Sequence, residues 1–217
     1  DRYGNLVAAL GTPRLAMPPV ALVAHMDHPG FEIMEVDDTH ATARAVGGVP
    51  IASLVKSTPV IVLLPNGDKV CATTKRHGST LDSMGRMDER LVTLALDREL
   101  PAAPPLPVVF DLPDFELDGN IIRMRALDDL AGCAAILAAL ERASKHDGPR
   151  IYGVFTRAEE GGLFGARLLA GEGTLPSDTM VVSVESSAVI PGVEQGKGPV
   201  IRTGDAATTF NADAESV

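Results

Sequence analysis

The sequence predicts an α/β fold: an α/β/α sandwich domain, assembled from the two ends of the chain, with an inserted small β-rich, barrel-like domain. After Asn120, apolar runs that suit strands alternate with stretches that suit helices, which is typical of parallel βαβ units. Between residues 44 and 120, turn signals separate short apolar runs, which is typical of hairpins. We therefore expect residues 1–43 and 121–217 to form the α/β domain, truncated at both ends, and residues 44–120 to form the insert.

Three short apolar runs are the expected strands of the α/β domain, and they cover residues 20–24, 151–156 and 180–184. Runs of this kind, rich in β-branched residues, suit strands that are covered on both faces. Helices are expected over residues 128–146, where acids stand at the start and basic residues at the end, and over residues 163–170.

The insert is expected to consist mainly of strands. A hairpin is predicted where runs at residues 60–64 and 69–74 flank Pro65-Asn66-Gly67-Asp68, because Asn-Gly is the strongest short-range hairpin signal. Residues 87–100 are expected to form one helix, ended by a proline-rich segment. A further strand is expected around residues 31–36, ahead of the insert.

Composition limits the classes of function. No run approaches the roughly 20 apolar residues that a membrane helix requires, so we expect no membrane span. The 29 acidic and 19 basic residues give a formal charge of −10, which argues against a nucleic-acid partner, because such binding depends on clustered Lys and Arg. We expect a cytoplasmic protein whose acidity is partly neutralised by divalent cations.

Polar residues stand at the ends of the three expected strands. His25 and Asp27 follow the first strand, Glu159 and Glu160 the second, and Glu185 the third. Ligands of open α/β sheets collect at the carboxyl ends of the strands, so these residues are expected to converge. The candidate ligands of one metal centre are His25, Asp128, Glu160 and Glu185.

These residue types suit a two-metal hydrolase. Asp27 and His25 are two apart on an extended segment, so the carboxylate can orient the imidazole. Asp128 has two oxygens that can bridge cations about 3.5 to 4 Å apart. Of Glu159 and Glu160, one can bind metal while the other acts as general base toward a metal-bound water. Alternatively, the aspartate pair only caps a helix and the glutamate pair is a solvated loop.

Six motifs occur in order along the chain: DRYGNL at 1–6, AHMDHPGF at 24–31, GG at 47–48, ALDDLAG at 126–132, FTRAEEGGLFGA at 155–166 and QGKGPVIR at 195–202. This series resembles the co-catalytic metallo-aminopeptidases that include the tetrahedral, deblocking and glutamyl aminopeptidases. The resemblance implies hydrolysis of N-terminal residues from peptides through a metal-bridging water, with two divalent ions, zinc or cobalt. It also implies a homo-oligomer built partly through the insert.

The resemblance assigns a role to each candidate residue. Asp27 would orient His25, and Glu159 would be the general base. The implied metal ligands are His25 and Glu185 for one ion, Glu160 for the other, and Asp128 as the bridge.

Three departures from the family pattern keep other functions open. The residues after Glu185 contain no histidine, which the family uses as a ligand of the second ion; His28 replaces a usual glutamate, and Leu130 a common arginine. These departures suit a non-catalytic assembly or binding module with a decayed metal centre. Paired carboxylates would also suit a glycosidase, and His-x-Asp with Glu-Glu would suit a carboxypeptidase or amidohydrolase of the same clan.

Overall fold

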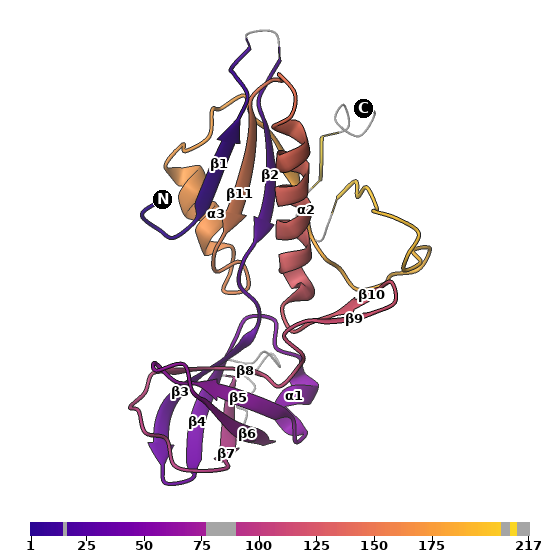
Figure 1. Ribbon diagram of the computed structural model, residues 1–217. Coiled ribbons are helices and arrows are strands. Elements are labelled where there is room, and N and C mark those ends of the chain that lie inside the picture. The colour runs from indigo at the N-terminus through magenta and orange to yellow at the C-terminus, as the bar shows by residue number, and fades with distance from the viewer. Residues whose placement is uncertain (15–16, 77–89, 205–208, 212–217) are drawn as a thin grey trace. The chain divides into compact units, whose positions relative to one another are not determined.

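The computed structural model describes residues 1–14, 17–76, 90–204 and 209–211 (Figure 1). Asp1–Ser186 form one compact unit, and Ser187–Val217 form a second. The described residues of the second unit contain turns and one isolated bridge between Gly204 and Thr209, and no helix or strand. All elements below belong to the first unit.

A four-stranded sheet has the order β1–β11–β2–β12. Its strands are β1 (Leu6–Leu10), β2 (Val20–His25), β11 (Ile151–Thr156) and β12 (Met180–Ser183). Strand β2 is parallel to both β11 and β12, and β1 is antiparallel to β11. His25 pairs with Thr156, and Val23 with Ser183, so the three parallel strands end at the same edge. The three predicted strands are confirmed; β1 was not predicted.

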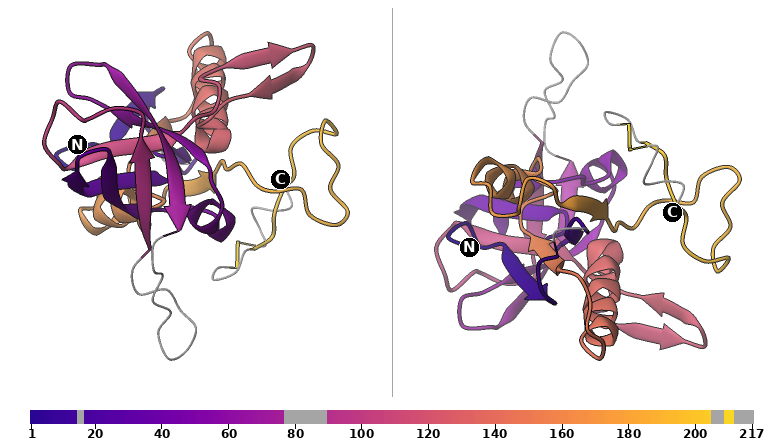
Figure 2. Two further views of the ribbon diagram at one scale, coloured as in Figure 1. Left: turned by 90° about the horizontal axis from the view of Figure 1, so that it is seen from below. Right: turned by 90° about the horizontal axis from the view of Figure 1, so that it is seen from above.

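Two helices cover opposite faces of this sheet (Figure 2). Helix α2 (Leu127–Ala143) packs on the face that contains Ala24, and α3 (Phe164–Gly171) on the face that contains Ala21. Residues an odd number apart on a strand point to opposite faces, so β2 contributes to both cores. The expected α/β/α sandwich is confirmed. Among the described residues, no helix is both long and apolar enough to cross a membrane.

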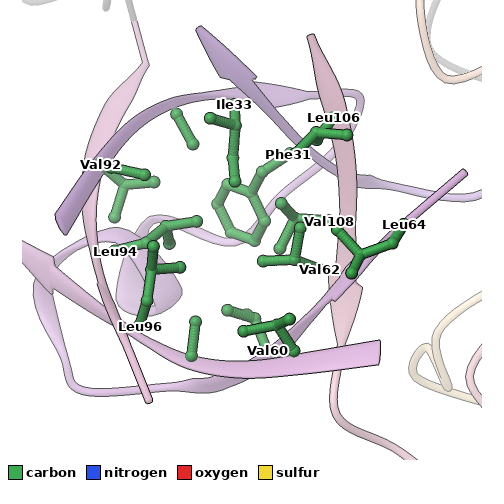
Figure 3. Packing of buried hydrophobic residues seen from close by; sticks show 14 of the residues in the cluster. Phe31, Ile33, Val60, Val62, Leu64, Val92, Leu94, Leu96, Leu106 and Val108 are labelled. Carbon is green, nitrogen blue, oxygen red and sulfur yellow. The ribbon is translucent and has the colours of Figure 1, made fainter. Parts of the chain in front are cut away.

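Six antiparallel strands close into a barrel in the order β3–β4–β7–β6–β5–β8. They are β3 (Gly30–Asp37), β4 (His40–Val46), β5 (Pro59–Leu63), β6 (Lys69–Arg76), β7 (Leu91–Leu96) and β8 (Leu106–Phe110), with helix α1 (Ile51–Val55) between β4 and β5. Phe31 and aliphatic side chains fill the interior (Figure 3). The barrel is therefore a packed core, as expected for a barrel of few strands, and the β-rich insert is confirmed.

The chain enters the barrel earlier than the sequence suggested. Strand β3 begins at Gly30, so residues 30–43, expected in the first part of the α/β domain, contribute β3 and most of β4 to the barrel. After the barrel, β9 (Glu116–Asp118) and β10 (Ile121–Arg123) form a separate two-stranded hairpin before α2.

The helix predicted for residues 87–100 is wrong in its described part, because Leu91–Leu96 is strand β7. The residues of this strand alternate in burial, and Val92 and Leu94 are fully buried. Leu and Ala favour a helix by propensity, but the period of two fits a strand between two barrel neighbours. The predicted hairpin around Asn66-Gly67 is confirmed, since it joins β5 to β6.

Candidate metal centre

The side chains of His25, Asp128 and Glu185 meet at the carboxyl edge of the sheet. Each offers one ligand atom, and these atoms lie within 4.8 Å of one another. His25 Nε2 is 3.1 Å from Asp128 Oδ1 and 3.4 Å from Glu185 Oε1. One imidazole nitrogen with two carboxylate oxygens is a donor set that suits a zinc-type divalent ion. The structure therefore brings together three of the four predicted ligands.

Local structure explains why these three residues converge. His25 is the last residue of β2 and is buried, while Glu185 follows the neighbouring parallel strand β12 by two residues. Asp128 and Asp129 lie inside the bounds of α2 but have non-helical φ and ψ values, and the peptide bond between them is cis. The regular helix therefore begins after the aspartate pair, two residues later than predicted.

Asp27 has a different set of contacts from the predicted one. His25 Nδ1 donates to the Asp27 carbonyl oxygen at 2.9 Å, which leaves Nε2 facing the carboxylate cluster. The Asp27 carboxylate is 3.7 Å from Nδ1, and it accepts hydrogen bonds from the amides of Glu159 at 3.0 Å and Glu160 at 3.2 Å. Asp27 thus orients the imidazole through its backbone and the glutamate pair through its side chain.

Glu159 and Glu160 diverge, as neighbours after a strand are expected to do. Glu159 Oε2 lies 3.9 Å from His25 Nε2, beside the cluster. Glu160 Oε2 instead accepts a hydrogen bond of 2.9 Å from the Gly48 amide, in the loop after β4. Among the described residues, Glu160 does not join the group whose ligand atoms could share one ion.

Glycines allow the barrel loop to approach Glu160 closely. A Cβ on Gly48 would lie 3.1 Å from Glu160 Oε2, and one on Gly47 would lie 2.8 Å from Glu160 Cβ. Gly47 also has φ +79°, a conformation that favours glycine. Arg90 donates from Nη1 to the Gly47 carbonyl oxygen at 2.9 Å and so holds this loop. The Gly-Gly pair was noticed in the sequence, but its contact with Glu160 was not predicted.

The gathered carboxylates change the proton affinities of the cluster. Burial, then a hydrogen bond with Asp128 and the negative charge of Asp129, raise the pKa of Glu185 to about 7. Burial lowers the pKa of His25, but the negative charge of Glu185, the hydrogen bond to the Asp27 carbonyl and the charges of Glu159 and Asp128 together raise that pKa by more. Burial also raises the pKa of Glu159. A bound cation would reduce the repulsion between these closely spaced carboxylates.

Asp129 lies buried behind the cluster and was not predicted to take part. Its Oδ1 accepts hydrogen bonds from the Gly132 amide at 3.1 Å and the Ser186 hydroxyl at 3.3 Å, and burial raises its pKa. Cys133 Sγ donates to the His25 carbonyl oxygen at 3.2 Å. Asp129 therefore caps α2, as the helix-cap interpretation of the aspartate pair expected, while Asp128 faces His25.

The α/β/α sandwich with a barrel insert thus carries a histidine–carboxylate cluster where its parallel strands end, which is where open α/β sheets bind their ligands. The family model of the M42 glutamyl aminopeptidases matches residues 4–215. The chain belongs to this family.

Two solved structures and one curated protein are similar to the chain. PhTET1-12s, a dodecamer, aligns with a TM-score of 0.78 and 26% identity over 100% of this chain and 67% of its own. The TET1 peptidase of Pyrococcus horikoshii can assemble into a tetrahedron or a large octahedral shell. It aligns with a TM-score of 0.76 and 26% identity, over 100% of this chain and 68% of its own. A protein of Acetivibrio thermocellus, provisionally named an aminopeptidase, is 28% identical over 213 residues. The alignment covers 94% of this chain but only 62% of that relative.

Proposed function

We propose that the protein is a metal-dependent aminopeptidase that removes N-terminal residues from peptides. The observation that carries this proposal is the convergence of His25, Asp128 and Glu185 within 4.8 Å in a chain of the M42 family. Similarity to the TET1 peptidase supports it further.

The converging donors suit a divalent ion, and zinc or cobalt matches their mixture of nitrogen and carboxylate oxygen. We propose that a second ion binds beside the first. His25 and Glu185 would bind one ion, Asp128 would be shared, and Glu160 would bind the other. Glu160 would use the carboxylate oxygen that does not accept the Gly48 hydrogen bond. When bound, such ions polarise a peptide carbonyl and lower the pKa of a water molecule.

Glu159 would act as the general base. Its carboxylate is partly buried beside His25, and burial raises its pKa, which favours acceptance of a proton. Oε2 would take a proton from the attacking water and later donate it to the nitrogen of the leaving amine. The Asp27 carboxylate, bonded to the amides of both glutamates, would hold this base in position.

A pocket of about 520 Å³ includes Asp27 in its lining, and we propose that it receives part of the peptide. It is lined by residues 26–28, 30–32 and 105–109 and by Val46. Asp27 also accepts the hydrogen bond from the Glu159 amide, so one residue contacts both the pocket and the proposed general base.

We further propose that the protein is cytoplasmic and that it forms a homo-oligomer. The assemblies of the similar TET1 peptidase support the oligomer. Light scattering on the purified chain tests the assembly. A multiple of the 22.7 kDa mass is expected, and a monomer at all concentrations would contradict it.

Hydrolysis of aminoacyl p-nitroanilides tests the activity. Release of nitroaniline is expected to stop after treatment with a chelator and to return when zinc or cobalt is added. Glu159→Gln should lower turnover at least about a hundredfold, whereas Glu141→Gln, the same change at an exposed position of α2, should not. Chelator-resistant hydrolysis, or full activity of Glu159→Gln, would refute the proposed function.

A further inference from the structure

We propose that Asn5 is a positioning residue for the glutamate loop, residues 157–165, which contains Glu159 and Glu160. Its side chain connects the two ends of this loop from the N-terminal segment of the chain. The catalytic meaning of this connection rests on the proposed function, but the geometry of the connection does not.

The glutamate loop has a conformation that ordinary residues adopt reluctantly. Ala158 and Leu163 have φ values of 52° and 61°, in the left-handed region that costs free energy for residues with a Cβ. Within the loop, the amides of Gly162 and Leu163 both donate to the Glu159 carbonyl oxygen at 2.8 Å. Such a conformation persists only where surrounding contacts determine it.

Asn5 supplies those contacts at both ends of the loop. Its Oδ1 accepts a hydrogen bond from the Arg157 amide at 3.1 Å, and its Nδ2 donates to the Gly165 carbonyl oxygen at 3.1 Å. Asn5 is fully buried, so both bonds are shielded from competing water. A Cβ at position 165 would lie 2.4 Å from Asn5 Oδ1, so Gly165 leaves the space that the amide fills.

The second hydrogen of Asn5 fixes which way the amide faces. Nδ2 also donates to Asp1 Oδ2 at 2.8 Å, and the other oxygen of Asp1 accepts the backbone amide of Asn5 at 2.9 Å. With a carboxylate on the Nδ2 side, Oδ1 must face the Arg157 amide. Asn5 therefore holds the ends of the loop, and Asp27 holds its middle through the amides of Glu159 and Glu160.

Hydrogen exchange of the metal-free, chelator-treated protein tests this proposal without substrate or metal. In Asn5→Ala, exchange of the amides in residues 157–165 is expected to rise at least about tenfold. Asn5→Ser keeps a neutral hydrogen-bonding group that is too short to join Arg157 to Gly165, so an intermediate rise is expected. It also provides the same readout if Asn5→Ala does not fold.

Thr74→Val is the matched control. Thr74 is fully buried in the barrel, where its hydroxyl accepts from the Thr58 amide at 3.0 Å and donates to the Lys56 carbonyl at 2.9 Å. Its loss should destabilise the protein while leaving exchange in the glutamate loop unchanged. Equal loop exchange in the Asn5 and Thr74 variants would overturn the positioning role.

Kinetics give a second readout. In Asn5→Ala, kcat is expected to fall about tenfold to a hundredfold, as is typical when a supporting contact is lost, while KM changes less than about threefold. A kcat equal to that of Thr74→Val would overturn the proposal. If the wild type proves inactive, the proposed function fails, whereas the exchange comparison still decides the role of Asn5.

Discussion

His25, Asp128 and Glu185 already face one another within 4.8 Å, whereas Glu160 is bonded to Gly48 of the barrel loop. The first half of the proposed centre comes from the ends of two neighbouring parallel strands and the start of a helix packed on them. The second half depends on a loop with left-handed residues, held by separate contacts. Sheet geometry thus assembles the first group, whereas the second group is held by hydrogen bonds that involve Asp27 and Gly48.

Substitution of Asp128 is expected to have the largest effect on activity, because Asp128 is the proposed ligand of both ions. Asp128→Asn should lower kcat/KM about a thousandfold or more and abolish tight binding of both ions. Asp147→Asn, the same change at an exposed position, is the control. Metal analysis of the dialysed variants checks this, and retention of two ions by Asp128→Asn would rule out a shared ligand.

Glu159 should separate catalysis from metal binding. Glu159→Gln is expected to lower kcat about a hundredfold to ten-thousandfold, as loss of a general base does. Metal content should remain at the wild-type level, because Glu159 is not among the proposed ligands. Steady-state kinetics combined with elemental analysis checks both quantities, and loss of metal would instead make Glu159 a ligand.

Substitution of Glu160 tests whether the two proposed metal sites bind their ions independently. Glu160→Gln should weaken the second ion about tenfold to a hundredfold while leaving the affinity of the first ion unchanged. Calorimetric titration with zinc resolves the two steps. An equal loss at both steps would mean that the halves form one cooperative unit and would remove the distinction drawn above.

Protonation of Glu185 predicts a pH dependence for the metal-free protein. Its pKa is raised from 4.5 to about 7, so the folded protein holds this proton more tightly than the unfolded chain. The resulting stability is fully present below pH 4.5 and is lost as pH rises through about 7. The Tm difference between wild type and Glu185→Gln should change over this window, and saturating zinc should remove the change. A pH-independent difference would contradict the raised pKa.

The smallest effect is expected at Gly48. Its added Cβ in Gly48→Ala would lie 3.1 Å from Glu160 Oε2, so the carboxylate must shift by a few tenths of an ångström. The affinity of the second ion should fall by less than about tenfold. Gly171→Ala, which meets open space, serves as the control. If both variants bind the second ion like the wild type, the barrel loop does not position Glu160.

Residues near strand ends were the most predictable part of the molecule. β-branched runs identified β2, β11 and β12, and the rule that ligands gather at the carboxyl ends of parallel strands predicted that His25 and Glu185 would meet. Strand β7 was missed because its Leu and Ala residues favour a helix, while its burial between β4 and β6 depends on distant segments.

Contacts between residues far apart in the sequence could not be predicted from local sequence patterns. Gly48 meets Glu160 across 112 positions, and Asn5 meets Gly165 across 160. Gly48 and Asn5 both lie in motifs of the sequence, but a motif does not predict which atoms its residues contact. The sequence likewise did not distinguish the roles of Asp128 and Asp129. Their difference depends on non-helical φ and ψ values at both residues, which the residue types alone do not predict.

A zinc titration by calorimetry on the chelator-treated wild type, His25→Ala and Glu160→Ala is the most direct test of the proposed metal centre. The wild type should bind two equivalents, His25→Ala should lose the tighter one, and Glu160→Ala should retain it. Absence of saturable binding, or binding that His25→Ala leaves unchanged, would contradict a metal centre at the ends of these strands.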